Sequence, residues 1–164
     1  MKSTPTRGVK QILKPNAYKQ LEGSSLQSSV AARESGMTER AGFEELDVYR
    51  RAYGAALRVH ALSLGFPAIE RYALADQMRR ASRSICANIA EGHGRTATSR
   101  RDARRFLGMA ASSADEMRVW ASFARDLGCI DARAAAAMIR EYREIARMLQ
   151  GLSRSWGGVR ATDD

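Results

Sequence analysis

Residues 77–95 read QMRRASRSICANIAEGHGR, and this stretch predicts more of the fold than any other part of the chain. Its apolar residues recur at the i, i+3, i+4 spacing of one helical face. We expect that face to be buried, and it comprises Met78, Ala81, Ile85, Asn88 and Ile89. Arginines occupy mainly the remaining faces, and the glycines in 92–94 predict that the helix stops after residue 90. The stretch therefore predicts a packed face, a positively charged face and a turn.

The same helical periodicity extends through the rest of the chain after residue 42. It predicts helices at residues 44–64, 74–90, 99–127 and 131–155, with Gly157-Gly158 ending the ordered region. Ser99 and Asp131 are placed as N-caps of the third and fourth helices, and Gly128 is placed to end the third. Four helices with short connections predict an all-α fold, an antiparallel up-down four-helix bundle.

Helical spacing also predicts which side chains point into the bundle. For the first helix the predicted inward residues are Leu46, Tyr49, Tyr53, Ala56, Leu57, His60 and Leu64. For the third they are Phe106, Met109, Ala110, Ser113, Met117, Trp120, Ala124 and Leu127, and for the fourth Met138, Tyr142, Ile145, Leu149 and Leu152. Asn88 is expected to hydrogen-bond across the bundle and fix helix register, because an unsatisfied amide on a buried stripe is costly.

Composition divides the chain into three parts. Residues 1–42 are basic and poor in large apolar side chains, which predicts a disordered extension, and a translation start at Met37 would remove most of it. Residues 43–155 form the predicted bundle. Residues 156–164 are predicted to be a flexible tail, in which Trp156 either folds back on the bundle or is available to a partner.

Several classes of protein fit the sequence poorly. No segment is apolar enough to suggest a membrane span or a signal peptide, so we expect a cytoplasmic protein. Cys86 and Cys129 lack metal or redox spacing and are expected to be free thiols. The chain contains no Glu-x-x-His pair and no serine–base constellation, so we expect no metal, no cofactor and no enzymatic activity.

Positive charge is the clearest functional signal. The net charge is +9, and residues 71–105 contribute nine basic and three acidic residues to it. Eight arginines in this region are the predicted nucleic-acid-binding residues: Arg79, Arg80, Arg83, Arg95, Arg100, Arg101, Arg104 and Arg105. Two alternatives remain open: an arginine-rich coding bias, and a solvated face on which Asp76, Glu91 and Asp102 neutralise several arginines within or between subunits.

The motifs Gln77-x-x-Arg80-Ala81-x-x-Ser84-Ile85 and Asn88-Ile89-Ala90-Glu91-Gly92-x-Gly94-Arg95 resemble a known family. It comprises four-helix-bundle proteins encoded by intervening sequences in bacterial 23S ribosomal RNA genes, and it is similar to the accessory variability proteins of diversity-generating retroelements. The resemblance implies a homopentameric ring without demonstrated enzyme activity. It also marks Gln77, Asn88, Glu91, Gly92 and Gly94 as a structural motif. In the retroelement relatives a basic surface engages nucleic acid and a reverse transcriptase.

Two functional hypotheses follow. In the first, the protein is a non-enzymatic oligomer that binds RNA or DNA electrostatically through its arginine-rich surface, as a retroelement-type accessory protein does. In the second, it is a protein-interaction scaffold, for example for a reverse transcriptase, with no direct nucleic-acid role.

Overall fold

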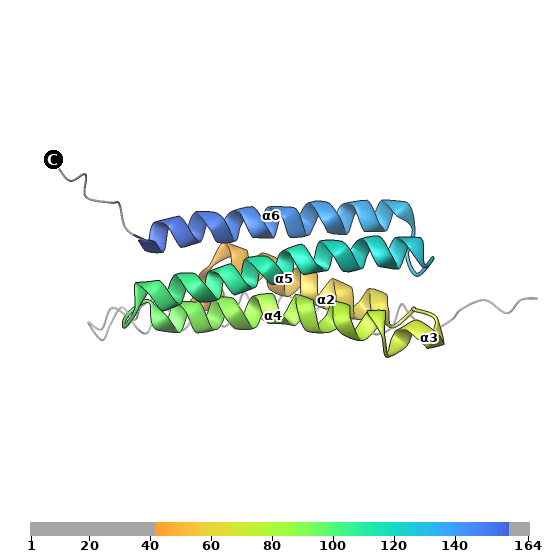
Figure 1. Cartoon of the computed structure of the whole chain (residues 1–164), viewed down its shortest axis with the longest axis horizontal. Coiled ribbons are helices and arrows are strands. Elements are labelled where there is room, and N and C mark those ends of the chain that lie inside the picture. The colour runs from red at the N-terminus through yellow and green to blue at the C-terminus, as the bar shows by residue number, and fades with distance from the viewer. Residues whose placement is uncertain (1–41, 158–164) are drawn as a thin grey trace, which may run out of the picture. The chain divides into compact units, whose positions relative to one another are not determined.

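The computed structural model describes residues 42–157, so nearly all of the predicted extension, 1–42, and the last seven residues lie outside the described part. A short 3-10 turn, η2 (Phe43–Glu45), precedes α2 (Asp47–Ser63) and the four-residue α3 (Ala68–Arg71). Three long helices follow: α4 (Leu74–Arg95), α5 (Arg100–Asp126) and α6 (Ala132–Gly157) (Figure 1). The described residues contain no strand, which confirms the all-α prediction with four main helices.

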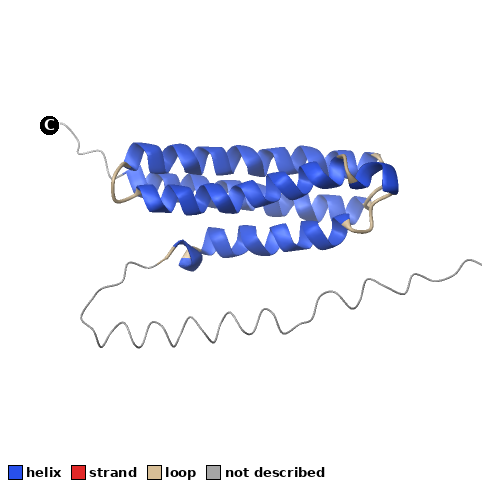
Figure 2. Ribbon diagram, turned by 90° about the horizontal axis from the view of Figure 1, so that it is seen from below, coloured by secondary structure: helices blue, strands red, loops and turns tan. Residues whose placement is uncertain are grey.

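The four main helices pack side by side (Figure 2). α5 packs extensively along both α4 and α6, whereas α2 packs on α4 and makes fewer contacts with α6. Successive helices run in opposite directions because short connections join them at alternate ends (Figure 1). The core lies between them and includes Met78, Ile85, Leu107, Tyr142 and Leu149, each almost completely buried.

Three predicted helix ends are confirmed. The Ser99 Oγ accepts a hydrogen bond from the Asp102 backbone N–H at 3.1 Å, and an Asp131 carboxylate oxygen accepts one from the Ala134 N–H at 2.7 Å. Gly128 follows the end of α5 with φ of 70°, the left-handed conformation that glycine adopts without strain. These caps satisfy donors and acceptors that a helix end leaves unpaired.

The predicted stop of the second helix at Gly92-His93-Gly94 was wrong. α4 continues to Arg95, and Gly92 is buried inside it. A Cβ atom on Gly92 would lie 3.0 Å from the Ala103 carbonyl oxygen of α5. The glycine therefore serves the close approach of two helices rather than a turn.

The predicted close of the ordered region at Gly157-Gly158 agrees with the end of α6, but the prediction that Trp156 lies beyond the helix was wrong. α6 continues to Gly157 and includes Trp156, which had been assigned to the flexible tail. Trp156 is half-buried and packs against the core, so the fold-back alternative is the one observed.

The predicted inward face of the first helix was wrong by a rotation of about one residue. The buried apolar residues of α2 are Val48, Ala52, Ala55 and Val59, while Tyr53, Leu57, His60 and Leu64 are exposed. Small inward side chains let two helix axes approach closely, and this packing outweighed the larger side chains of the other face.

α5 shows the same preference for small inward residues. Of its predicted inward set, Ala110, Met117 and Ala124 are buried, but Met109 and Leu127 are exposed, and the remaining three are half-buried. The α5 seam is completed by Ala103, Leu107, Ala114 and Ala121. In α6, by contrast, four of the five predicted residues are buried and Leu152 is half-buried.

Candidate nucleic-acid interface

Four arginines occupy the first two turns of α5, where Ser99 caps the helix. They surround a surface depression of about 340 Å³, which is lined by Arg100, Arg101, Arg104, Arg105, Ser153 and Gly157. α5 contributes the arginines and the end of α6 contributes the other two residues. We call this set of six residues the arginine depression.

The arginine side chains of the arginine depression contact different groups. The Arg105 guanidinium carbon lies 5.6 Å from the centroid of the Phe106 ring, within the range of a cation–π contact. The Arg104 side chain reaches the end of α6 and passes beside Gly157. Among residues 42–157, none of the four arginines forms an ion pair.

The location of these arginines is locally unfavourable for the helix. A helix N-terminus carries a partial positive charge, so each cation there costs roughly 0.3–1 kcal/mol at an exposed position. The first six residues of α5 contain four arginines and one carboxylate, Asp102. Because charge and helix dipole add rather than cancel, this end of the bundle attracts anions. A local conflict of this kind is typical of functional surfaces.

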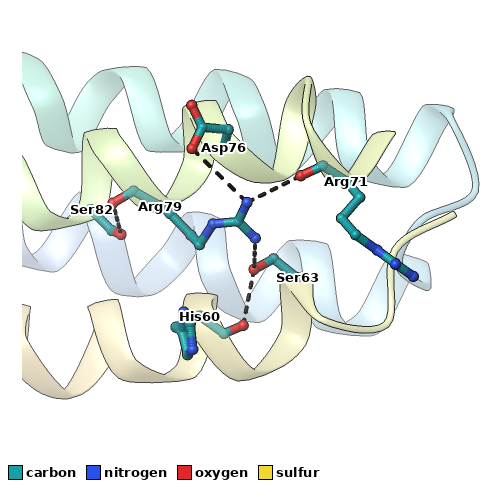
Figure 3. Close-up of polar contacts among 6 residues, drawn as sticks. All are labelled: His60, Ser63, Arg71, Asp76, Arg79 and Ser82. Atoms are coloured by element: carbon teal, nitrogen blue, oxygen red, sulfur yellow. Dashed lines mark hydrogen bonds and ion pairs between the residues drawn. The ribbon is translucent and has the colours of Figure 1, made fainter. Parts of the chain in front are cut away.

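Arg95 and Arg79, also predicted to bind nucleic acid, are engaged in other contacts. Arg95 Nη2 lies 3.0 Å from a carboxylate oxygen of Glu91, one turn earlier in α4. Figure 3 shows the Arg79 guanidinium lying among Ser63 of α2, Arg71 of α3 and Asp76 of its own helix. It donates to the Ser63 hydroxyl and to the Arg71 carbonyl oxygen, both at 3.1 Å, and lies 4.0 Å from the Asp76 carboxylate.

The structure therefore does not gather the eight predicted arginines at the turn between α4 and α5. Arg79 precedes Arg95 by sixteen residues, about 24 Å along a helix that rises 1.5 Å per residue. Arg80 is exposed on the first half of α4, and so is Arg83. Only the four α5 arginines line the depression, and Arg79 holds α2, α3 and α4 together.

An aromatic cluster at the same end of the bundle was missed from the sequence. The His93 ring lies between Phe43 and Trp156, with ring centroids 6.4 and 6.2 Å away. Phe43 also contacts Tyr49 edge-on at 4.9 Å. The cluster joins η2 and the end of α6 to α4, so it helps to position Gly157 beside Arg104. No local sequence pattern could have joined Phe43, His93 and Trp156, which come from three elements far apart in the chain.

The predicted structural-motif residues have different environments. Gln77 and Gly94 are exposed, whereas Gly92 is buried against α5. The Asn88 amide donates to the Ser84 carbonyl oxygen at 2.9 Å and to the Ser84 hydroxyl at 3.1 Å, both within α4. The prediction that Asn88 bonds directly across the bundle was wrong. Ser84 makes that contact instead, through a hydrogen bond between its hydroxyl and the Ser113 hydroxyl of α5 at 3.1 Å.

Two titratable groups with a raised pKa, the half-buried Cys86 and the buried Tyr142, lie away from the arginine depression. Burial raises the pKa of the Cys86 thiol to about 11, so the thiol is protonated at neutral pH and is a poor nucleophile. Burial, followed by the charge of Glu141, also raises the pKa of the Tyr142 hydroxyl. No group of three or more His, Cys, Asp or Glu residues within 42–157 is placed to hold a metal ion.

No helix in the described part of the chain has the length and apolar character needed to span a membrane.

Comparison with known proteins identifies relatives. The family model described as 23S rRNA-intervening sequence protein matches residues 44–151. A crystal structure of a protein with unknown function from the S23 ribosomal protein family of Bacteroides thetaiotaomicron is similar, with a TM-score of 0.59 and 23% sequence identity. The similarity covers 65% of this chain and 95% of that chain. A search of curated proteins found no match.

Proposed function

Since the chain belongs to the 23S rRNA-intervening sequence protein family, we propose that it is a non-enzymatic oligomer that binds RNA or other nucleic acid through the arginine depression. Binding is electrostatic and weakly dependent on base sequence, because guanidinium groups contact phosphates rather than base edges. A retroelement-type accessory role is the cellular context that this activity fits.

One observation carries the proposal: four guanidinium groups that form no ion pair with any residue of 42–157 line one depression at a helix N-terminus. Arginine presents a planar fork of donors that matches the geometry of a phosphate group. Some other arginines are less available to a phosphate, since Arg95, Arg118 and Arg125 each pair with an acidic residue of their own helix. Arginines without an ion pair also lie elsewhere among residues 42–157, but only in the arginine depression do four of them fall within six consecutive residues and line one concave surface.

Oligomerisation strengthens the proposed binding. In a homopentamer, five copies of the arginine depression would act on one nucleic acid, and a second contact made by an already bound chain costs less entropy than the first. Weak individual contacts then add to a stable complex that is sensitive to salt.

The test uses two variants with equal net charge. The site variant replaces four arginines with glutamine: Arg100, Arg101, Arg104 and Arg105. The control variant makes the same replacement at four exposed arginines elsewhere, none in an ion pair within the described residues: Arg51, Arg133, Arg140 and Arg143. Affinity for a single-stranded RNA is measured by fluorescence anisotropy at several salt concentrations.

We expect the site variant to lose most of its affinity and the control variant to lose little. Each phosphate contact contributes about −0.7 to the slope of log affinity against log salt for a single strand, so loss of four contacts reduces that slope by about 3. Equal losses in the two variants would show that net charge, rather than the arginine depression, governs binding, and would refute the proposal.

A second candidate is a protein-interaction scaffold for a partner such as a reverse transcriptase. It is favoured by large apolar side chains exposed on two helices, among them Leu57 of α2 and Phe123 of α5. A protein partner that remains bound after nuclease treatment, and that still binds the site variant, supports this second function over the first.

A further inference from the structure

A second depression lies directly beside the arginine depression, between α5 and α6. It has a volume of about 270 Å³ and is lined by Leu107, Gly108, Ala111, Leu149, Gln150, Ser153 and Arg154. We call this set of seven residues the apolar depression. Ser153 lines both depressions, so the two form one continuous groove along the two helices. One end of the groove is cationic and the other is largely apolar.

The two depressions follow each other in the same order along both helices. α5 and α6 run in opposite directions, so the groove passes from residues 100–105 to residues 107–111 on α5 and from Gly157 back to Leu149 on α6. Arg104 and Gly108 are one turn apart, about 6 Å along a helix that rises 1.5 Å per residue. A single nucleotide spans such a distance between its phosphate and its base.

The apolar depression is open because Gly108 has no side chain. Leu107 and Leu149 are almost completely buried, so they form the floor of the depression. A Cβ atom on Gly108 would meet no atom within 4 Å, which leaves free space above this floor. The space is therefore bounded by apolar atoms below and can accept a flat apolar group from solvent.

Polar groups at the rim of the apolar depression match a nucleobase. Gln150 and Arg154 both line the depression and are exposed. An amide can hydrogen-bond to the edge of a base, and a guanidinium plane can stack on its face. Arg154 forms no ion pair with any residue of 42–157, and no carboxylate lines either depression. An alkyl chain would give these polar groups no partner, so a base fits the rim better.

We propose that the groove binds single-stranded nucleic acid, with a phosphate in the arginine depression and an unpaired base in the apolar depression. This inference rests on the proposed function and adds a base subsite to it. A phosphate of a single strand or of a duplex can enter the arginine depression, but a base in a duplex is paired and stacked, so its face cannot reach the protein. The substrate class is therefore single-stranded RNA or DNA.

The test fills the apolar depression without changing the charge of the chain. Gly108→Leu places an alkyl side chain in it, and we expect the fold to be retained because the new Cβ meets nothing within 4 Å. Gly94→Leu is the matched control: Gly94 is also an exposed helical glycine with free space at its Cβ position, and it lines neither depression. Circular dichroism checks that both variants are folded.

Fluorescence anisotropy compares an oligouridylate, the same strand with abasic residues, and an RNA duplex of the same length. We expect the unmodified chain to bind the oligouridylate about fivefold or more tightly than the abasic strand, a modest effect for contact with one base. Gly108→Leu should lose this advantage and bind the abasic strand and the duplex normally. Gly94→Leu should bind all three probes as the unmodified chain does.

Three results would overturn the inference. The first is equal affinity of the unmodified chain for the oligouridylate and the abasic strand, a measurement that requires no variant to fold. The second is a Gly108→Leu chain that binds the oligouridylate normally, which would assign the apolar depression to another occupant. The third is an equal loss of affinity for all three probes, because the substitution would then obstruct the groove without displacing a base.

The glutamine variant of Arg100, Arg101, Arg104 and Arg105 separates this inference from the proposed function. Loss of binding in that variant, with normal oligouridylate binding by Gly108→Leu, overturns only the base subsite. Normal binding in that variant, with weakened oligouridylate binding by Gly108→Leu, overturns only the role of the arginine depression. An unmodified chain that binds none of the three probes overturns both.

Discussion

Gly92 provides the most direct test of how closely α4 and α5 approach. A methyl group on Gly92 would lie 3.0 Å from the Ala103 carbonyl oxygen, 3.2 Å from Phe106 Cβ and 3.4 Å from the Trp156 ring. The first contact is with backbone, which can move only if α5 moves. Gly108 is the matched control, because it lies within α5 and a methyl group there meets nothing within 4 Å.

Both glycines gain the same intrinsic benefit when replaced by alanine, about 0.5–1 kcal/mol of helix stability. Gly108→Ala is therefore expected to raise the free energy of unfolding by about that amount. Gly92→Ala adds an overpacking cost of about 1–3 kcal/mol, so its net effect is expected to range from about zero to a loss of about 2.5 kcal/mol. The difference between the two variants isolates the contact.

Urea denaturation followed by circular dichroism measures this difference, at one protein concentration because self-association, as proposed, would add to stability in a concentration-dependent way. We expect the two variants to differ by at least about 1 kcal/mol. If Gly92→Ala stabilises the protein as much as Gly108→Ala does, the two helices do not approach as closely as described, and the interpretation of Gly92 as a packing residue is refuted.

Three further predictions concern Arg79, Cys86 and Tyr142. Arg79→Gln should lower the free energy of unfolding by about 1–3 kcal/mol, because it removes charged hydrogen bonds to α2 and α3, while the exposed Arg80→Gln should change it little in the same denaturation assay. The pKa of Cys86 is raised from about 9 to about 11 in the folded protein, so folding favours the neutral thiol. The stability that this group contributes is therefore complete below pH 9 and declines as the pH rises from about 9 to about 11. Cys86→Ala should reduce that decline in urea melts recorded over this pH range. The Tyr142 hydroxyl is buried and has no hydrogen-bond partner within the described residues, so Tyr142→Phe should leave stability unchanged or raise it by up to about 1 kcal/mol; a loss of more than 1 kcal/mol in a urea melt would reveal a missing partner.

The position of the candidate site could largely be predicted from the sequence, but which arginines line it could not. The dense arginines at residues 100–105 and the cap at Ser99 are visible as local patterns, and the structure places them around one depression. Arg79 looks equivalent in the sequence, yet its neighbours are Ser63 and Arg71 from earlier elements. An arginine exposed to solvent and one that hydrogen-bonds to other helices look alike in the sequence, because the difference depends on which distant residues the fold places beside them.

The sequence by itself determined that the chain is helical, where most helices begin, and which face of α4 and α6 is buried. Those features follow from periodicity and capping, which depend on residues within a few positions of one another. Tertiary structure decided the rest: α4 runs through Gly92 because α5 packs against it there, and α2 turns Ala52 and Ala55 inward in place of Tyr53 and Leu57. A wide apolar face fits several orientations equally well, and only the shape of the neighbouring helices selects the one that packs closely.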